Sequence, residues 1–461
     1  MNDFINTEVS PELIKRYNLP GPRYTSYPTV PVWKEGNFSK EYSDCLNREG
    51  KNEKPISLYI HIPFCKQLCT FCGCNKYITN NKNLVEKYLT SLEREICTVS
   101  NRLGKKKELA EIHLGGGTPT YLRLNQLEKL MDILFSKFKT NLVKEWAFEA
   151  DPRVTSKKHL EILYHHGFSR VSFGIQDLNP AIQQAINRNQ TLEQSWDTFN
   201  NAREIGYKSI NLDLVYGLPL QTKSLFRYTL EEILKMRPDR LAIYSFAFLP
   251  GMFKTHLRAI REQDLPNAEE KVSIYLEAIN CLEQAGYVMI GMDHYSLPED
   301  ELAQALNKKT LHRNFMGYTT LHNMSQIGIG VSAISDFGNS YFQNQKDIFQ
   351  YIDEIYDSNI IPRKSIHLDL EDQLRRKVIE TLMCHGEISI KYFENIFKID
   401  FQKHFANALK KLKIFEKEKL VKLSPQSIIL TDLGRLFMRN VVMTFDRHLE
   451  TIKKPKFSQT V

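Results

Sequence analysis

Four of the eight cysteines stand within ten residues of one another, at positions 65, 69, 72 and 74. The first three have the spacing C-x3-C-x2-C, in which three thiolates on one tight loop can each ligate one iron of a [4Fe-4S] cube. The fourth iron then keeps an open coordination position, to which a further ligand can bind. We therefore interpret Cys65, Cys69 and Cys72 as the ligands of an iron-sulfur cluster.

A zinc site is the main alternative for clustered cysteines. Zinc ligands usually come as two separated pairs, or as cysteines with added histidines. His61 precedes the loop and could reach it, but no partner histidine follows at zinc-finger spacing. Cysteines without any metal are a third interpretation, and Cys45, Cys97, Cys281 and Cys384 are scattered in the way of ordinary buried thiols. The clustering of the others favours a metal site in a reducing compartment over a disulfide scaffold.

Further polar and glycine-rich positions could bind a ligand. The run Gly115-Gly-Gly-Thr-Pro119 follows an apolar stretch, so backbone groups could approach a ligand there, but such a run is more often a turn, and no Lys-Ser/Thr follows to make a P-loop. Glu149, Gln176, Arg188 and Asp213 could supply carboxylates for hydroxyl groups, an amide, and a cation for a carboxylate. Each of them alone could equally be a solvated or helix-capping residue.

These residues need a scaffold, and the chain between 57 and 246 alternates β-rich runs with amphipathic helical patterns. The expected strands are 57–62, 111–114, 145–150, 170–175, 209–214 and 241–246, and the expected helices are 84–101, 124–138, 156–166, 192–205 and 224–235. Six βα units in series predict a parallel sheet closed into a partial (β/α)6 barrel, with ligand chemistry at the carboxyl ends of the strands. The marked residues follow or end these strands, so we expect them on one rim.

The length of 461 residues predicts more than one structural unit. Residues 1–50 form an irregular lead whose Gly- and Pro-rich part is either a surface segment or a lid, and 51–365 hold the barrel and its extension, including a helix at 268–286. Residues 366–461 show helices at 374–384, 388–396, 401–412 and 432–447 and a hairpin at 420–430. This order resembles a winged-helix or small helical domain, without the dense basic face of a DNA reader.

Charge and hydropathy limit the partners. The formal net charge is +8, but Lys and Arg are spread along the chain, which favours an anionic small substrate over nucleic acid. No apolar run approaches the length of a membrane span, and residues 1–20 are polar and acidic where a secretory leader would be basic and then apolar. We expect a cytoplasmic protein, and from its broadly polar composition a monomer.

Taken together, these residues resemble the radical S-adenosylmethionine (SAM) superfamily, whose signature is the C-x3-C-x2-C loop after the first strand of a partial barrel. Within it, the chain resembles the oxygen-independent coproporphyrinogen III oxidase family, from its N-terminal lead to its C-terminal domain. That lead and Cys74 separate it from the related heme-chaperone branch, which typically lacks the lead and has Phe at the cysteine position. The motifs that carry the resemblance are Gly21-Pro-Arg-Tyr-Thr-Ser-Tyr-Pro28, Tyr59-Ile-His-Ile-Pro-Phe-Cys65, Cys72-Gly-Cys74-Asn-Lys76, Gly115-Gly-Gly-Thr-Pro-Thr-Tyr-Leu122, Val215-Tyr-Gly-Leu-Pro219, Gly291-Met-Asp-His294, His312-Arg-Asn-Phe315 and Gly330-Val-Ser-Ala-Ile-Ser335.

The resemblance implies a [4Fe-4S] cluster on Cys65, Cys69 and Cys72 and two molecules of SAM. Cys74 accompanies the family pattern and is not expected to ligate iron. Arg23, Arg313 and Lys76 are candidates for binding substrate carboxylates, because they stand in motifs that should border the mouth of the barrel. The positions implied for the first SAM are Tyr59, Gly116, Glu149 and Ile334, and those for the second are Phe71, Gly117, Thr118, Gln176, Arg188, Asp213 and Ala247.

The implied activity is the oxidative decarboxylation of coproporphyrinogen III to protoporphyrinogen IX in heme biosynthesis. A SAM-derived 5′-deoxyadenosyl radical takes hydrogen from the β-carbon of a propionate, and loss of CO2 and one electron leaves a vinyl group, twice per substrate. The electron donor and final acceptor remain unidentified. The family usually reads Tyr-Ala-His-Leu/Val-Pro where this chain reads Phe246-Ala-Phe-Leu-Pro250. A heme chaperone and a radical SAM enzyme acting on another tetrapyrrole therefore stay open as alternatives.

Overall fold

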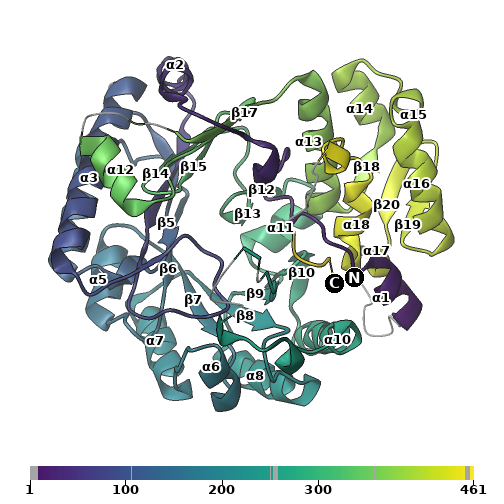
Figure 1. Ribbon diagram of the computed structural model, residues 1–461, viewed down its shortest axis with the longest axis horizontal. Helices are drawn as coiled ribbons and strands as arrows, with labels where there is room; N and C mark the ends of the chain where they lie inside the picture. The colour runs from purple at the N-terminus through teal and green to yellow at the C-terminus, as the bar shows by residue number, and fades with distance from the viewer. Residues whose placement is uncertain are drawn as a thin grey trace.

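The computed structural model describes residues 9–104, 106–249, 251–252, 258–356, 360, 362–451 and 457–460. A barrel-like sheet surrounded by helices lies beside a smaller, mainly helical unit (Figure 1), where Thr460 near the end of the chain contacts Tyr17 near its start. The α/β class and the partial barrel predicted from the sequence are confirmed.

Six parallel strands form the centre of the sheet, in the order in which they occur along the chain. They are β2 (Ile56–Ile62), β5 (Leu109–Gly116), β6 (Glu145–Ala150), β7 (Arg170–Gln176), β8 (Ser209–Tyr216) and β9 (Arg240–Ser245). Each matches one of the six predicted strands to within two residues at either end. Because all six run in the same direction, their carboxyl ends meet on one rim.

Helices connect these strands and cover the outside of the sheet (Figure 1). Five of them begin at a polar side chain that caps the first turn: Asn81, Ser156, Asn179, Thr191 and Thr222. The helices of the barrel are α3 (Lys82–Leu103), α4 (Leu124–Lys137), α5 (Lys157–His165), α6 (Pro180–Ala185), α7 (Leu192–Ile205) and α8 (Lys223–Met236). All five predicted barrel helices are therefore present, with the short α6 in addition.

The sheet is wider than the sequence predicted. β14 (Gln326–Ile329), for which no strand was predicted, pairs parallel to β2 as a seventh parallel strand. Antiparallel strands extend both sides of the parallel run: β15, β16, β17 and β1 beyond β14, and β11 and β10 beyond β9. Their bounds are β15 (Ile334–Asp336), β16 (Ser340–Gln343), β17 (Lys364–His367), β1 (Lys34–Glu35), β11 (His294–Ser296) and β10 (Val288–Gly291).

Shorter elements complete this part of the chain. The helices are α10 (Ala268–Gln284), which ends two residues before the predicted end, α11 (Glu301–Asn307) and α12 (Ile348–Tyr356). The short strand pairs are β3 (Phe64–Cys65) with β4 (Tyr77–Ile78), and β12 (His312–Asn314) with β13 (Gly317–Thr319).

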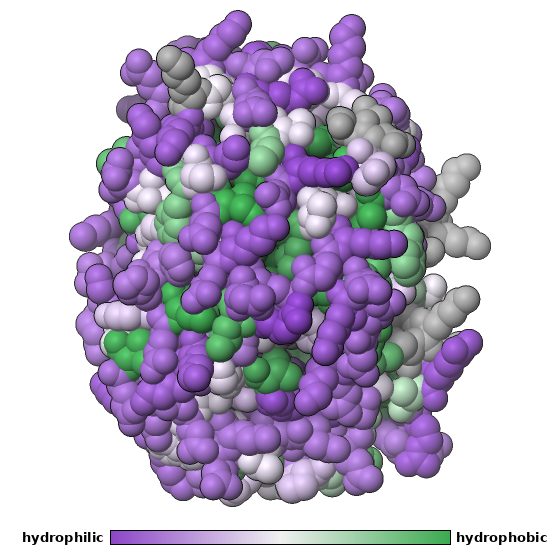
Figure 2. Space-filling view, turned by 90° about the vertical axis from the view of Figure 1, so that its left-hand side faces the viewer, coloured by the Kyte–Doolittle hydropathy of each residue, from purple (hydrophilic) through white to green (hydrophobic). Residues whose placement is uncertain are grey.

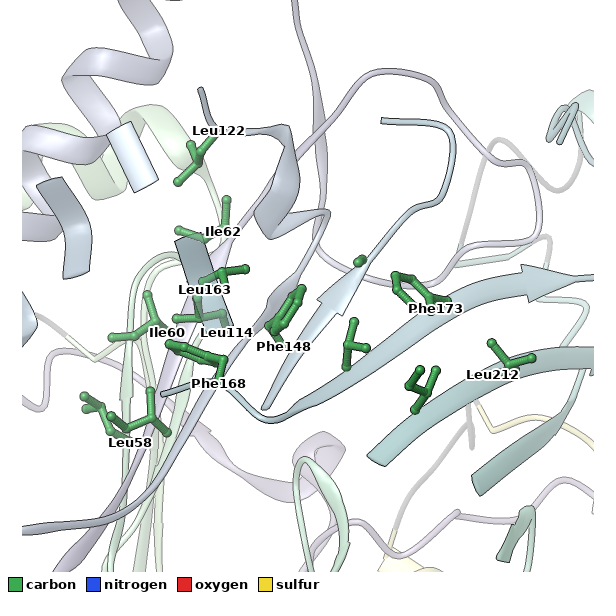
Figure 3. Packing of buried hydrophobic residues seen from close by; sticks show 14 of the residues in the cluster. Leu58, Ile60, Ile62, Leu114, Leu122, Phe148, Leu163, Phe168, Phe173 and Leu212 are labelled. Atoms are coloured by element: carbon green, nitrogen blue, oxygen red, sulfur yellow. The ribbon is translucent and has the colours of Figure 1, made fainter. Parts of the chain in front are cut away.

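Alternation along the strands separates an apolar side of the sheet from a polar one. Leu58, Ile60 and Ile62 of β2 are fully buried in the large apolar core between the sheet and its helices. Figure 3 shows them with side chains of β5, β6 and β7 and with Leu163 of α5. Successive residues of a strand face opposite sides, so Tyr59 and His61 face the barrel interior, where polar groups can gather. Burial of each large apolar side chain stabilises the fold by about 1.5–3 kcal/mol. The register that keeps these side chains in the core is therefore the favoured one.

The C-terminal unit has its own apolar core and a three-stranded antiparallel sheet. Its elements are α13 (Leu370–His385), β18 (Glu387–Ser389), α14 (Ile390–Phe397), α15 (Phe401–His404), α16 (Ala406–Lys417), β19 (Val421–Leu423), β20 (Ser427–Leu430), α17 (Asp432–Leu436) and α18 (Met438–Met443). Two predicted helices, 401–412 and 432–447, are each split, at Phe405 and Phe437. Both residues have ψ near 20° and bury their rings in this core, which interrupts the helical hydrogen bonding.

The predicted irregular lead is wrong in two places, because it contains α1 (Pro11–Tyr17) and α2 (Ser39–Gly50). Tyr17 packs in the core of the C-terminal unit, as do Tyr24 and Tyr27, whereas Leu46 of α2 packs in the core of the barrel. We call residues 18–28 the strap. It runs from the C-terminal unit to the barrel and pairs with residues 458–460, which we call the tail, through a Pro20–Gln459 bridge.

The outer face of the barrel on the α3 side carries mostly hydrophilic side chains, and its apolar side chains lie in small separate areas (Figure 2). Among the described helices, none combines the length and the apolar character that a membrane crossing needs.

Candidate functional site

The cysteine loop connects β2 to α3 at the carboxyl end of the sheet. The β3–β4 pair closes its base, since the Tyr77 amide donates to the Pro63 carbonyl at 2.6 Å. At its tip the Thr70 amide donates to the Ile186 carbonyl at 3.0 Å, which fastens the loop to the end of α6. All cysteines of the loop are free thiols.

A cavity of about 560 Å³ lies at this rim, and the loop forms one of its walls. It brings together most of the positions predicted from the sequence, and they come from the strap, the cysteine loop, the ends of five strands and the segment between α6 and α7. These positions are Arg23, Cys65, Cys69, Phe71, Cys72, Cys74, Lys76, Gly116, Gly117, Thr118, Glu149, Gln176, Arg188, Asp213, Phe246 and Ala247.

Three predicted positions are not among the described residues that line this cavity. Tyr59 lies below its floor, where its ring stacks on His113 with 5.9 Å between ring centres. Ile334 of β15 packs beside an aromatic cluster around Trp33 and Tyr341. Arg313 donates to the backbone carbonyl of Arg23 at 2.8 Å, so it contacts the strap where the sequence suggested a substrate carboxylate.

The glycine-rich exit of β5 packs directly against the start of the cysteine loop. The Gly117 amide donates to the Ile62 carbonyl at 2.8 Å, and the Thr118 amide donates to the Phe64 carbonyl at 2.9 Å. A side chain at Gly117 would bring its Cβ within 2.6 Å of the Pro63 carbonyl. Glycine is required here because the two backbones approach so closely, and the same approach leaves one side of the run open to the cavity.

Glu149 ends β6 at the floor of the cavity, with 42% of its side chain exposed. Its Oε2 accepts from the Gly116 amide at 2.9 Å, and its Oε1 lies 3.6 Å from Nε2 of His113. Desolvation opposes its charged form, but His113 and the amide outweigh it, so the pKa of Glu149 lies below its usual value. The carboxylate is held ionised and aimed at the glycine run.

A second group of charges surrounds Cys69. Arg153 donates to the Cys69 sulfur at 3.4 Å, and Arg188 donates to it at 3.6 Å. The same two arginines bind Asp151, with Arg153 holding both carboxylate oxygens. Although burial raises it, these guanidinium groups bring the pKa of Asp151 below its usual value. The opposite wall holds Asp213, whose pKa burial raises to about 6.

The three candidate ligand thiols differ in environment. Burial raises the pKa of Cys65 to about 11. A hydrogen bond from the Cys74 thiol, together with the Lys76 ammonium, lowers the pKa of Cys72 below its usual value despite its burial. Lys76 also donates to the Cys72 carbonyl at 2.6 Å. The loop thus already favours a thiolate at one ligand position.

A four-iron cluster fits this loop. Across the described residues, no group of three or more His, Cys, Asp and Glu side chains is arranged to hold a metal ion. A cluster makes a different demand, because each thiolate binds its own iron and the three sulfurs must border a volume. Cys65, Cys69 and Cys72 border one, with guanidinium groups beside one sulfur and open cavity in front of them.

His61, the histidine that a zinc site would have used, is otherwise engaged. Its Nε2 lies 2.8 Å from the Asn75 carbonyl, and its Nδ1 lies 3.0 Å from the Tyr59 hydroxyl. A carbonyl can only accept, so Nε2 carries the proton and Nδ1 accepts from Tyr59. Nε2 thus holds the loop at Asn75, while the Tyr59 hydroxyl occupies Nδ1.

The wall opposite the cysteine loop combines the strap with the end of β9. Arg23 forms an ion pair with Asp293 and lies over the Tyr244 ring, 5.8 Å from its centre. Phe246 is 5% exposed and belongs to an apolar cluster in which Phe71 and Phe248 also pack. Pro250, the last residue of the divergent motif, lies outside the described residues.

Sequence reasoning missed four residues of this site: Arg153, Ser172, Tyr244 and Asp293. The first three line the cavity, and Asp293 pairs with Arg23. Arg153 follows the end of β6 and Ser172 lies within β7, so their places near strand ends were the available signal. The contacts of Asp293 and Tyr244 with the strap join segments too far apart in the chain for any local pattern to reveal.

Comparisons with known proteins agree with this geometry. Residues 59–233 match the family model described as the radical SAM superfamily, and residues 368–437 match the HemN C-terminal domain model. The oxygen-independent coproporphyrinogen III oxidase of Pseudomonas aeruginosa is 40% identical over 454 residues, which is 98% of this chain and 98% of that protein. The enzyme of the same name from Escherichia coli is 41% identical over 450 residues, covering 97% and 98%.

A solved structure gives the same result in three dimensions. The coproporphyrinogen III oxidase of Escherichia coli, described as a radical SAM enzyme, superimposes with a TM-score of 0.90 at 40% identity. The match covers 96% of this chain and 99% of that one. The partial barrel, the cysteine loop and the cavity in front of it define a radical SAM protein, which carries a [4Fe-4S] cluster and uses SAM. More narrowly, the chain belongs to the family of oxygen-independent coproporphyrinogen III oxidases.

Proposed function

We propose that this protein catalyses the oxygen-independent oxidative decarboxylation of coproporphyrinogen III to protoporphyrinogen IX, a step of heme biosynthesis. The observation that carries this proposal is the single cavity that joins the three cysteines to the polar strand ends and the strap, in a chain 40% identical to enzymes of that name over nearly its whole length. When bound, the cluster and SAM supply a 5′-deoxyadenosyl radical that removes one hydrogen atom from a substrate propionate. Each propionate then loses CO2 and one electron and becomes a vinyl group.

Cys65, Cys69 and Cys72 hold the cluster in this proposal. The glycine run would hold the first SAM, because Gly116 leaves room there and the ionised Glu149 could accept from its hydroxyl or ammonium groups. Tyr59 and Ile334 complete the implied contacts from positions behind the described cavity wall. Because Tyr59 donates to His61, it acts through the histidine that holds the loop.

A second SAM occupies the remainder of the same cavity. Arg188 and Asp213 provide one charge of each sign on its walls, and Gln176 adds an amide. The remaining implied positions pack around these groups: Phe71, Gly117, Thr118 and Ala247.

The anionic tetrapyrrole meets the cavity on the side of the strap. Arg23 and Lys76 line the cavity and supply cations for its carboxylates. Arg313 supports the strap instead, since it donates to the Arg23 carbonyl. Cys74 stays unligated and donates to Cys72 when no cluster is bound.

The proposal also covers the location of the protein, its oligomeric state, its redox partners and its domain boundaries. A cytoplasmic location, a monomeric state and an external electron donor and acceptor are the predictions made from the sequence. The division into a lead of residues 1–50, a barrel region of 51–365 and a C-terminal domain of 366–461 is also a prediction. The separate apolar core of the C-terminal unit supports its last boundary.

The decisive experiment is an anaerobic assay of the reconstituted protein with coproporphyrinogen III, SAM and a chemical reductant. We expect a product that has lost the mass of formic acid twice, with 5′-deoxyadenosine formed in step. The Cys69→Ala variant is the matched control and should give neither product. Stable heme binding without conversion would contradict the proposal and identify a carrier.

One structural observation favours a second candidate, a radical SAM enzyme that acts on another tetrapyrrole. Phe246 lines the cavity where the family usually has tyrosine, and Phe248 packs nearby where it usually has histidine. An apolar wall at this point suits a substrate with fewer polar substituents. Turnover of a different porphyrinogen, with coproporphyrinogen III left unchanged, would support this candidate.

A further inference from the structure

Arg153 is bound more firmly than its place in a loop would suggest. It lies three residues after the end of β6, and its side chain is 12% exposed. Its Nε lies 3.0 Å from one oxygen of Asp151, and its Nη2 lies 2.6 Å from the other. Its remaining terminal nitrogen donates to the Gln67 amide oxygen at 3.3 Å. A two-point contact of this kind fixes the plane of a guanidinium group as well as its position.

The fixed plane aims Nη2 of Arg153 at Cys69. The nitrogen lies 3.4 Å from the sulfur, within the range of an N–H to sulfur hydrogen bond. Arg188 approaches the same sulfur at 3.6 Å from the other side and also contacts Asp151. Two guanidinium groups and one carboxylate therefore surround this sulfur, which leaves a surplus of one positive charge beside it.

The other two thiols of the C-x3-C-x2-C loop have different neighbours. Cys65 lies 3.6 Å from the neutral hydroxyl of Thr118. Cys72 is adjacent to the Cys74 thiol and the Lys76 ammonium. Of the three sulfurs, that of Cys69 is thus the one with two guanidinium donors beside it.

Charge beside a cluster sulfur changes how easily the cluster accepts an electron. Reduction adds one negative charge, and both nearby positive charge and hydrogen bonds to sulfur stabilise the reduced form more than the oxidised form. The effect is strong at a site largely withdrawn from water, where charges are weakly screened.

We propose that Arg153, oriented by Asp151, is a positioning residue that donates to the Cys69 sulfur and raises the reduction potential of the cluster bound there. This inference rests on the proposed ligation of the cluster by Cys69. Arg188 contributes in the same direction, but it is also one of the positions implied for the second SAM, whereas Arg153 is not. Arg153 is therefore the residue whose effect can be measured separately.

The test is a potentiometric titration of the reconstituted protein, followed by electron paramagnetic resonance in the absence of SAM and substrate. Arg153→Gln removes the positive charge, so its midpoint potential should be more negative than that of the wild type. Arg153→Lys keeps the charge without the fixed fork and should fall between the two. Asp151→Asn removes a negative charge, so its midpoint potential should move in the opposite direction, to a more positive value.

Shifts of the midpoint potential in opposite directions in Arg153→Gln and Asp151→Asn distinguish an electrostatic role from a structural one. Arg123→Gln is the matched control, because this arginine forms an exposed ion pair with Glu86 and should leave the potential unchanged. An unchanged potential in Arg153→Gln with a full complement of iron would overturn the inference. So would a negative shift in Asp151→Asn, or loss of iron from both Arg153 variants. A Cys69→Ala variant that keeps its cluster would instead overturn the proposed ligation.

Discussion

The guanidinium of Arg23 and the carboxylate of Asp293 form an ion pair at the cavity wall, with 28% and 8% of their side chains exposed. Arg23 belongs to the strap, and Asp293 lies in the turn between β10 and β11. The pair is therefore one of the points at which the strap is fastened to the barrel. Desolvation disfavours the charged form of Arg23, but Asp293 and the surrounding tyrosines hold its pKa above the usual value, so it stays charged.

Replacement of Arg23 by glutamine should impair use of the tetrapyrrole. The variant loses a cation at the cavity and leaves the buried Asp293 without its partner. Because a hydrogen bond to a charged group contributes about 1.5–3 kcal/mol, kcat/KM for coproporphyrinogen III should fall by about 10- to 100-fold. Steady-state kinetics under anaerobic conditions measure this, with Arg227→Gln as the control, since Arg227 is 55% exposed on α8. An unchanged kcat/KM would remove Arg23 from substrate binding.

Replacement of Arg439 by glutamine should release the strap. Arg439 donates to the carbonyl groups of Gly21, Pro22 and Gln459, which joins the strap to the tail. Its loss leaves buried carbonyl groups without donors, and we expect a destabilisation of about 3 kcal/mol. Hydrogen exchange of the amides in residues 18–28 should become faster.

The matched control for this experiment is Arg375→Gln. Arg375 donates to the Phe445 carbonyl at 2.7 Å within the C-terminal unit and is not hydrogen-bonded to the strap by any described contact. It should lower stability without a selective change in the exchange of residues 18–28. Equal exchange in the two variants would show that Arg439 does not hold the strap.

Restoring the usual residues at the end of β9 tests the divergent wall. We expect the double variant Phe246→Tyr, Phe248→His to convert the same porphyrinogen, with KM changed by less than about tenfold. The reason is that both rings pack in one apolar cluster at the cavity edge, so polar groups there change the wall by about one hydrogen bond. Competition between coproporphyrinogen III and other porphyrinogens measures the outcome. A wild-type protein that does not convert coproporphyrinogen III, together with a double variant that does, would contradict this expectation.

Stability should decrease as the pH rises through the range in which Glu95 ionises. This side chain is fully buried, and burial raises its pKa to about 6 although Tyr351, Gly330 and Asn344 donate to it. The folded state therefore binds the proton more tightly than the unfolded state, in which the pKa is 4.5. The resulting penalty is absent below pH 4.5, grows as the pH approaches 6, and then stays at about 2 kcal/mol.

Urea denaturation of the apoprotein at several pH values tests this for Glu95→Gln against the wild type. Other buried carboxyl groups titrate in the same range, so the informative quantity is the difference between the two proteins. That difference should change by about 2 kcal/mol in favour of the variant between pH 4.5 and pH 7. A difference independent of pH would show that Glu95 keeps an ordinary pKa in the folded protein.

The barrel could be predicted because each of its strands is followed by a long amphipathic helix. β14 escaped prediction since it has only four residues and pairs with β2, a strand about 270 positions earlier, by long-range contacts alone. The rim residues could be placed from strand ends, which correctly grouped Glu149 with Asp213. The direction of Arg313 and the pairing of Arg153 with Cys69 depend on side-chain orientation, which no periodicity encodes. The breaks at Phe405 and Phe437 follow from tertiary burial overriding helix preference.

The paired ends of the chain set an order of events during synthesis. The Thr460 hydroxyl donates to the Tyr17 carbonyl across 443 positions, so the strap leaves the ribosome long before the tail that holds it. During that interval the strap is held by its contacts with the barrel, among them the Arg23–Asp293 ion pair, and the tail adds its contacts last.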